Sequence, residues 1–135
     1  MVEMELFEIR IDESHWRQPQ IILLKEKNGD RILPIVIGLF EAQSIYIKVN
    51  NIPILRPFSH DLLADILVQL GGHLERILID ELKAETFYAK LIVDTQKGER
   101  LLIDSRPSDA IALALRREAP IFVNEEVLEQ VTSEE

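Results

Sequence analysis

The chain has 135 residues, of which 47% are hydrophobic, and this is enough to bury one core and fold as one domain. It contains no cysteine, which excludes disulfides, thiolate nucleophiles and cysteine-held zinc. The formal net charge of -9 weighs against nonspecific binding of nucleic acid, because such binding requires many lysine and arginine contacts to phosphates. Any contact with nucleic acid must therefore be local or assisted by a metal ion.

The N-terminal residues show no basic segment followed by an apolar one, and no apolar run approaches the ~20 residues that span a bilayer. The absence of cysteine is compatible with a reducing compartment. We therefore expect a cytoplasmic protein that does not enter a membrane.

The first part of the chain carries strand signals. Apolar and polar residues alternate over 5–12, which predicts a half-buried strand. A more apolar strand is expected over 20–26, followed by Asn28-Gly29, the strongest hairpin signal in the chain. This strand should therefore pair antiparallel with the next one, over 31–37.

Two helices are expected next. Apolar side chains at helical spacing predict an amphipathic helix over 39–49. A second helix should begin with a Ser59 cap and end at Leu70, because Gly71-Gly72 follows. We expect the apolar side chains of this second helix to be buried, namely Leu62, Leu63, Ile66, Leu67 and Leu70.

The second half of the chain again combines strands and helices. Strand signals cover 73–82, 86–94, 101–103 and 121–124, and helix signals cover 108–116 and 125–131. Residues 110–115 include no polar residue, so the helix over 108–116 should be the most buried one. The order of elements predicts a single compact α+β domain over 1–131 with a mixed or mostly antiparallel sheet and packed helices. Residues 132–135 form a polar tail.

The same short motif precedes two of the predicted helices. One copy reads Arg56-Pro57-Phe58-Ser59-His60-Asp61 and the other Arg106-Pro107-Ser108-Asp109. Helix capping by the serine, together with an aspartate that interacts favourably with the positive end of the helix dipole, is enough to explain a single copy. In the second copy the capping residue is Ser105 or Ser108. Two copies favour a shared site, because converging helix N-termini offer free backbone N–H groups to an anion. We therefore expect the starts of these helices to lie together.

Further polar residues belong to the same hypothesis. Asp104 precedes the second motif, and Glu41 lies at the start of the first helix, where it can join the cluster or remain a solvated surface residue. His60 alone is more often a surface or hydrogen-bonded histidine than a general base. A neighbouring carboxylate could tune it for acid–base chemistry.

Taken together, the motifs of the chain resemble those of the bifunctional nuclease family. The matching segments are Leu33-Pro34-Ile35-Val36-Ile37-Gly38 with Glu41-Ala42, Arg56-Pro57 with His60-Asp61-Leu62-Leu63, Phe87-Tyr88-Ala89-Lys90-Leu91, Asp104 with Arg106-Pro107-Ser108-Asp109-Ala110-Ile111-Ala112-Leu113-Ala114, and Pro120-Ile121 with Val123. Ser59 and Ser105 depart mildly from the family pattern. The resemblance implies an α+β domain that self-associates and a nuclease that acts on both DNA and RNA.

The resemblance does not fix the mechanism, but the residue types are compatible with phosphodiester hydrolysis assisted by one or two divalent cations, with Mg²⁺ or Mn²⁺ favoured by oxygen ligands. The candidate metal ligands are Glu41, Asp61, Asp104 and Asp109. The candidate catalytic residues are His60, Asp61, Asp104 and Asp109, and the candidate substrate-binding residues are Arg56, Arg106 and Ser108.

A rival hypothesis is a non-catalytic cytoplasmic module that binds a small anion or a protein partner through the same cluster. The net charge favours the rival, and the motif match favours the nuclease. In both cases we expect a homo-oligomer, most simply a homodimer, because short strands leave sheet edges that pairing would protect.

Overall fold

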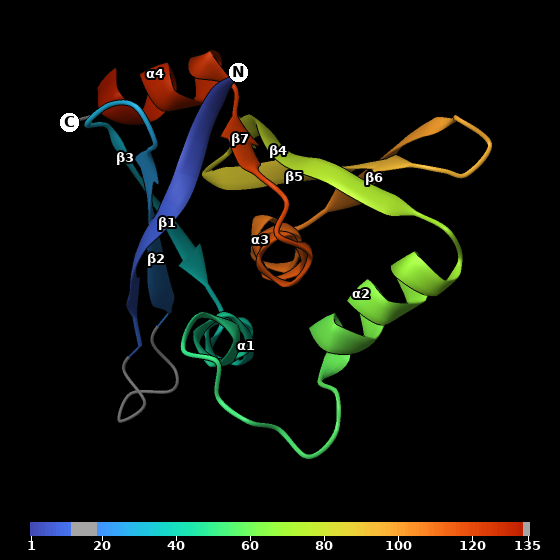
Figure 1. Ribbon diagram of the computed structural model, residues 1–135. Helices are drawn as coiled ribbons and strands as arrows, with labels where there is room; N and C mark the ends of the chain where they lie inside the picture. The colour runs from blue at the N-terminus through green and yellow to red at the C-terminus, as the bar shows by residue number, and fades with distance from the viewer. Residues whose placement is uncertain (12–18, 134–135) are drawn as a thin grey trace.

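The computed structural model describes residues 1–11 and 19–133. Its elements, shown in Figure 1, are β1 (Val2–Arg10), β2 (Gln20–Glu26), β3 (Ile32–Ile37), α1 (Leu39–Val49), α2 (Ser59–Gln69), β4 (His73–Lys83), β5 (Thr86–Asp94), β6 (Arg100–Ser105), α3 (Pro107–Arg117), β7 (Ile121–Val123) and α4 (Glu125–Ser133). Every predicted strand and helix has a counterpart among them. The predicted end of the first strand, Asp12, lies outside the described residues.

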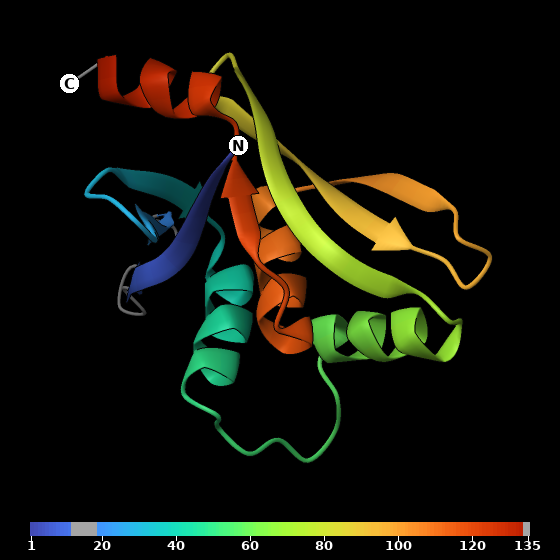
Figure 2. The same ribbon diagram turned by 45° about the horizontal axis from the view of Figure 1, so that its top comes forward.

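The described strands form one mixed sheet of seven strands, in the order β3-β2-β1-β7-β4-β5-β6. The pair β4–β7 is parallel, whereas the five other neighbouring pairs are antiparallel. Figure 2 shows α1 and α3 side by side on one side of the sheet, with the start of α2 next to α3, while α4 lies apart near the N-terminus. The predicted α+β class and mixed sheet are confirmed.

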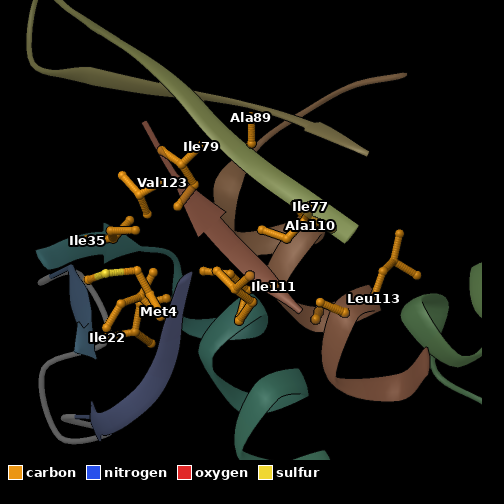
Figure 3. Packing of buried hydrophobic residues seen from close by; sticks show 14 of the residues in the cluster. Met4, Ile22, Ile35, Ile77, Ile79, Ala89, Ala110, Ile111, Leu113 and Val123 are labelled. Atoms are coloured by element: carbon orange, nitrogen blue, oxygen red, sulfur yellow. The ribbon is translucent and has the colours of Figure 1, made fainter. Parts of the chain in front are cut away.

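Helix α3 is the centre of this arrangement, since it contacts α1, α2, β4 and β5. Seven of its eleven residues are buried, compared with three in α1 and two in α2. Ile111 is fully buried in the same apolar cluster as Met4 of β1 and Ile22 of β2 (Figure 3). The alanines at 110, 112 and 114 let neighbouring elements approach closely. The prediction that this helix is the most buried is confirmed.

The predicted serine caps are wrong. Helix α3 has Arg106 as its N-cap, because Pro107 takes the first helical position, and no side chain caps that end. Ser105 Oγ donates instead to the Arg106 carbonyl at 2.9 Å. In α2 the N-cap residue is Phe58, so Ser59 is already helical. At the other end of the chain, α4 continues to Ser133, two residues into the predicted tail.

The predicted burial of the apolar side chains of α2 is also wrong. Only His60 and Ala64 of this helix are buried. Leu67 packs partly against the core, whereas the other four predicted side chains are roughly half or more exposed: Leu62, Leu63, Ile66 and Leu70. The reason is that α2 contacts the end of α3 and extends away from it (Figure 2), so most of its apolar surface has no neighbouring element. None of the described helices has the length and apolarity needed to span a bilayer.

Candidate functional site

The first turns of α2 and α3 contact each other through one pair of side chains, as the repeated motif predicts. His60, in the first turn of α2, places its Nε2 atom 2.8 Å from Oδ1 of Asp109 in the first turn of α3. Asp61 secures the start of α2, because its Oδ2 accepts the Phe58 backbone N–H at 3.0 Å. The two helix starts therefore form one site rather than two independent caps.

The other nitrogen of the buried His60 ring faces α1. Its Nδ1 atom lies 2.6 Å from the hydroxyl of Ser44. Ser44 is itself only 8% exposed, since His60 covers it. The histidine thus connects α1, α2 and α3 through one pair of hydrogen bonds, which fixes the orientation of its ring.

Arg116, in the last turn of α3, lies behind this histidine with a side chain that is 4% exposed. Its Nε atom donates to Asp61 Oδ1 at 2.7 Å, and its Nη2 atom donates to Ser44 Oγ at 3.1 Å and to the Ser44 carbonyl at 3.3 Å. Its Nη1 atom donates to the Ala112 carbonyl at 3.1 Å. A buried cation with this many acceptors locks the three helices together.

These contacts favour one tautomer of His60. Because a guanidinium can only donate, Ser44 Oγ accepts from Arg116 and is free to donate its own proton to His60 Nδ1. Nε2 then carries the ring proton and donates it to Asp109. A neutral His60 protonated on Nε2 satisfies every member of this chain of hydrogen bonds.

Arg106 is the exposed cation of the site, with a side chain that is 66% exposed. Its Nε and Nη2 atoms donate to Oδ2 and Oδ1 of Asp109 at 2.8 and 3.2 Å. Its Nη1 atom lies 3.4 Å from Oε1 of Glu41 at the start of α1. The guanidinium therefore lies at the surface end of a polar network that continues inward through Asp109 and His60.

The carboxylates of the network are held in the charged state. Burial raises the pKa of Asp109, but the hydrogen bonds from Arg106 and His60 outweigh it and hold the pKa below its usual value. Burial likewise raises the pKa of Asp61, and the hydrogen bonds from Arg116 and the Phe58 N–H more than compensate, so that this pKa is also lowered. The pKa of Arg106 is raised, chiefly by its hydrogen bond to Asp109. Both aspartates are therefore anions at neutral pH.

A cleft of about 800 Å³ opens over this network. Its polar lining comes from α1, the start of α2, the end of β6 and the start of α3: Glu41, Gln43, Ser44, Ser59, His60, Asp104, Ser105, Arg106 and Asp109. Its apolar lining consists of Phe40, Ile47, Phe58, Leu63, Leu91, Ile103 and Leu113. This volume lies within the ~300–1,000 Å³ that is typical of small-molecule sites.

The structure brings together five of the eight residues that the sequence singles out, because the cleft lining includes Glu41, His60, Asp104, Arg106 and Asp109. Asp61 lies behind the cleft and pairs with Arg116. Ser108 is 6% exposed and lies outside the lining. Arg56 is exposed on the loop before α2, and it makes no ion pair with the part of the chain that the structure describes.

The four carboxylates expected to bind a divalent cation do not form a ligand set in this structure. Within residues 1–11 and 19–133, no three histidine, aspartate or glutamate side chains are arranged to hold a metal ion. Each candidate carboxylate instead faces a cation. Arg106 holds Glu41 and Asp109, Arg116 holds Asp61, and Lys90 lies 3.3 Å from Asp104. A divalent cation would have to displace at least one of these partners, so this arrangement does not fit Mg²⁺ or Mn²⁺.

Sequence reasoning missed two members of the network, Ser44 and Arg116. Ser44 shares the polar face of α1 with Glu41 and Lys48, and nothing in the spacing shows that His60 covers it. Arg116 did carry a signal, since it is the first charged residue after the apolar run 110–115 of a buried helix. A charge in that position needs a buried partner. The fold and the site together define an α+β domain with a cleft in which apolar walls adjoin a hydrogen-bonded polar network.

The model of the bifunctional nuclease domain family matches residues 22–135. An uncharacterized protein of Mycobacterium tuberculosis (strain H37Rv) is 42% identical over 130 residues, which cover 96% of this chain and 76% of that protein. Bifunctional nuclease 2 of Oryza sativa subsp. japonica is 29% identical over 79% of this chain and 34% of the rice protein. Bifunctional nuclease 1 of Arabidopsis thaliana is 27% identical over 78% of this chain and 33% of that protein.

The chain belongs to the bifunctional nuclease domain family, as its motifs predict. The match to the mycobacterial protein extends over most of both chains, whereas this chain spans about a third of the length of the plant nucleases.

Proposed function

We propose that this protein cleaves phosphodiester bonds in nucleic acid, at the cleft between α1, α2 and α3. One observation carries the proposal. In a member of the bifunctional nuclease domain family, an exposed arginine, a charged aspartate and a buried histidine form a continuous chain of hydrogen bonds along a cleft. A cation that binds phosphate, next to a group that can move a proton, is the minimum that phosphodiester cleavage requires.

In this proposal Arg106 binds the phosphate, since it is the accessible guanidinium of the cleft. Asp109 acts as general base: it takes a proton from the water that attacks the phosphorus, and this proton passes to the oxygen that leaves as the P–O bond breaks. The Nε2–H of His60 orients the Asp109 carboxylate. Ser44 and Arg116 position the ring from behind. Asp104 lies on the rim, where Lys90 neutralises it and reduces its repulsion of a phosphate.

Binding of a phosphate would also change Asp109. Arg106 supplies two of the three side-chain hydrogen bonds that Asp109 accepts. A phosphate that recruits these donors leaves the half-buried carboxylate with His60 alone, and burial then raises its pKa. Asp109 thus becomes a stronger base toward the attacking water when substrate is bound.

The test is a comparison of Arg106→Ala with Arg100→Ala. Both arginines are surface residues that pair with an aspartate, but Arg100 pairs with Asp94 away from the cleft. With rigorously purified proteins we expect Arg106→Ala to lower cleavage by about 10²-fold or more, and Arg100→Ala to leave it unchanged. Equal activity in both variants and in wild type would reveal a contaminating nuclease and would contradict the proposal.

Chelation provides a separate test of the metal expectation. Because every candidate carboxylate has a cationic partner, we expect cleavage to persist after a chelator removes divalent cations. Loss of activity that returns on addition of Mn²⁺ would mean that at least one of these ion pairs opens to admit a metal ion. The proposal that cleavage takes place in this cleft would still hold.

We also propose that copies of this chain self-associate through the apolar surface of α2. This surface consists of Leu62, Leu63, Ile66 and Leu70. Contiguous exposed apolar side chains on one helix are typical of an interaction surface.

The rival hypothesis, a non-catalytic module, also predicts self-association, so association does not separate the two hypotheses. Turnover does, because the rival module binds an anion at Arg106 without cleaving it.

A further inference from the structure

The cleft over the polar network has an aromatic wall. Phe40, in the first turn of α1, is 81% exposed, and Phe58, the N-cap residue of α2, is 47% exposed. Both side chains line the same cleft as Arg106. Phe7, by comparison, is 55% exposed on β1 and lies outside the lining. Two exposed rings beside the accessible cation of the cleft provide flat faces on which a ligand can stack.

The fixed charges of the cleft limit how much phosphate it can bind. Arg106 is the single lysine or arginine among the described lining residues, and it pairs with two of the three lining carboxylates, Glu41 and Asp109. A duplex or a long bound strand needs a succession of cations along its backbone. One guanidinium can serve one phosphodiester, and the described lining offers no second lysine or arginine to a further phosphate. The cleft therefore offers one phosphate position.

If phosphate contacts are limited to one, the remaining affinity must come from the bases. Proteins that bind single strands without sequence preference stack the bases on aromatic side chains, at ~1–3 kcal/mol per base. Bases in a duplex present only their edges, so they cannot reach Phe40 and Phe58 unless the duplex opens. The cleft volume of about 800 Å³ suits one or two nucleotides and is too small for a helix.

We infer that the cleft takes two unpaired bases joined by one phosphodiester, with the bases on Phe40 and Phe58 and the phosphate on Arg106. This inference rests on the proposed function and specifies its substrate class. The minimal substrate is a dinucleoside monophosphate, and longer single strands bind through one such step. Because stacking is tolerant of sequence and sugar, RNA and DNA steps are equivalent in this cleft.

The first experiment compares a dinucleoside monophosphate, a long single strand and the corresponding duplex with wild-type protein. We expect the dinucleoside monophosphate to be cleaved with a kcat/KM within about tenfold of one step in the long strand, and the duplex to be resistant. The logarithm of the affinity for the single strand should fall with the logarithm of salt concentration with a slope of about 0.7, the value for one phosphate. A salt dependence with the slope of several phosphates would overturn the inference. Cleavage of the duplex as fast as the single strand would also overturn it.

The second experiment replaces the rings. We expect Phe40→Leu and Phe58→Leu each to raise KM by about 5- to 140-fold with kcat unchanged, which corresponds to ~1–3 kcal/mol of stacking. Phe40→Trp should retain a low KM, and Phe7→Leu should match wild type. All three rings are exposed, so thermal melting should be unchanged. Unaltered KM in both cleft variants, or a change in particle mass without a change in KM, would overturn the inference and assign these rings to an interface between copies.

The outcomes separate this inference from the proposed function. Cleavage that depends on Arg106 but not on either phenylalanine leaves the nuclease proposal intact and overturns the stacking inference. Binding of the dinucleoside monophosphate that depends on Phe40 and Phe58, without cleavage in any protein sample, overturns the nuclease proposal and supports the ligand class.

Discussion

Replacement of Asp109 by asparagine is the sharpest perturbation of the network, because it removes one charge and almost no volume. Asp109 accepts from Arg106 twice and from His60 once. Asparagine has a single oxygen, so its amide nitrogen must face either Arg106, which can only donate, or Nε2 of His60. In the second case the His60 proton must move from Nε2 to Nδ1. Ser44 Oγ would then accept from both Arg116 and His60, and its own proton would lose its acceptor.

The expected loss of stability follows from how exposed the Arg106 and Asp109 side chains are. The Arg106–Asp109 pair is partly in solvent, with side chains 66% and 27% exposed, so the free energy of unfolding should fall by only about 1 kcal/mol. For a chain of this size that corresponds to a melting temperature lower by about 3–5 °C. Cleavage should fall by about 10²- to 10³-fold, because asparagine cannot act as a general base.

Three measurements on Asp109→Asn check this reasoning: thermal melting, cleavage of a single strand, and ¹⁵N NMR of the His60 ring. We expect the wild-type ring to carry its proton on Nε2 and the variant ring to carry it on Nδ1. Asp94→Asn is the matched control, since it removes a surface carboxylate that pairs with Arg100 outside the cleft. A variant that melts slightly lower and cleaves as fast as wild type would show that the cluster is only structural.

Two further predictions concern stability and association. The pKa values of Asp61 and Asp109 are lowered from the usual 3.8, so their contribution to stability is fully present above that pH and is lost as the pH falls below it. Urea unfolding from about pH 2.5 to 6 should show this loss, and Asp61→Asn should reduce it. Ile66→Glu places a charge on the apolar surface of α2, so light scattering should give a larger particle than 15.6 kDa for wild type and a monomer for the variant, with unchanged melting.

The elements of the fold could be predicted because their signals are local. Asn28-Gly29 between two apolar runs predicts the β2–β3 hairpin, and the apolar run 110–115 predicts a buried helix. The exposure of α2 could not be predicted in this way. Helical spacing shows that the apolar side chains share a face, but it does not show whether another element covers that face.

The candidate site was predictable only in part, for the same reason. The repeated motif correctly predicts that the first turns of α2 and α3 meet, since His60 of one motif lies 2.8 Å from Asp109 of the other. It also suggests that Arg56 and Arg106 are equivalent, and they are not. Arg56 remains on an exposed loop, and Asp61, the carboxylate of the first motif, pairs with Arg116 instead. Which arginine pairs with Asp61 depends on how α2 packs against α3.

The attachment of α2 to the rest of the domain depends on this same polar network. The helix buries only His60 and Ala64, so most of what holds it in place is the hydrogen bonding of His60 and Asp61 to α1 and α3. Arg116→Met leaves the partly buried Asp61 carboxylate without its guanidinium, which should lower the free energy of unfolding by about 1–3 kcal/mol.

Because α2 has few other buried contacts, we expect this loss to appear first as local opening. Hydrogen exchange of the α2 amides in Arg116→Met should accelerate more than exchange of the α3 amides. The neighbouring Arg117 is exposed, so Arg117→Met should leave both unchanged. Uniform acceleration across the domain would show instead that α2 opens only when the whole domain unfolds, and that the cleft is as stable as the core beneath it.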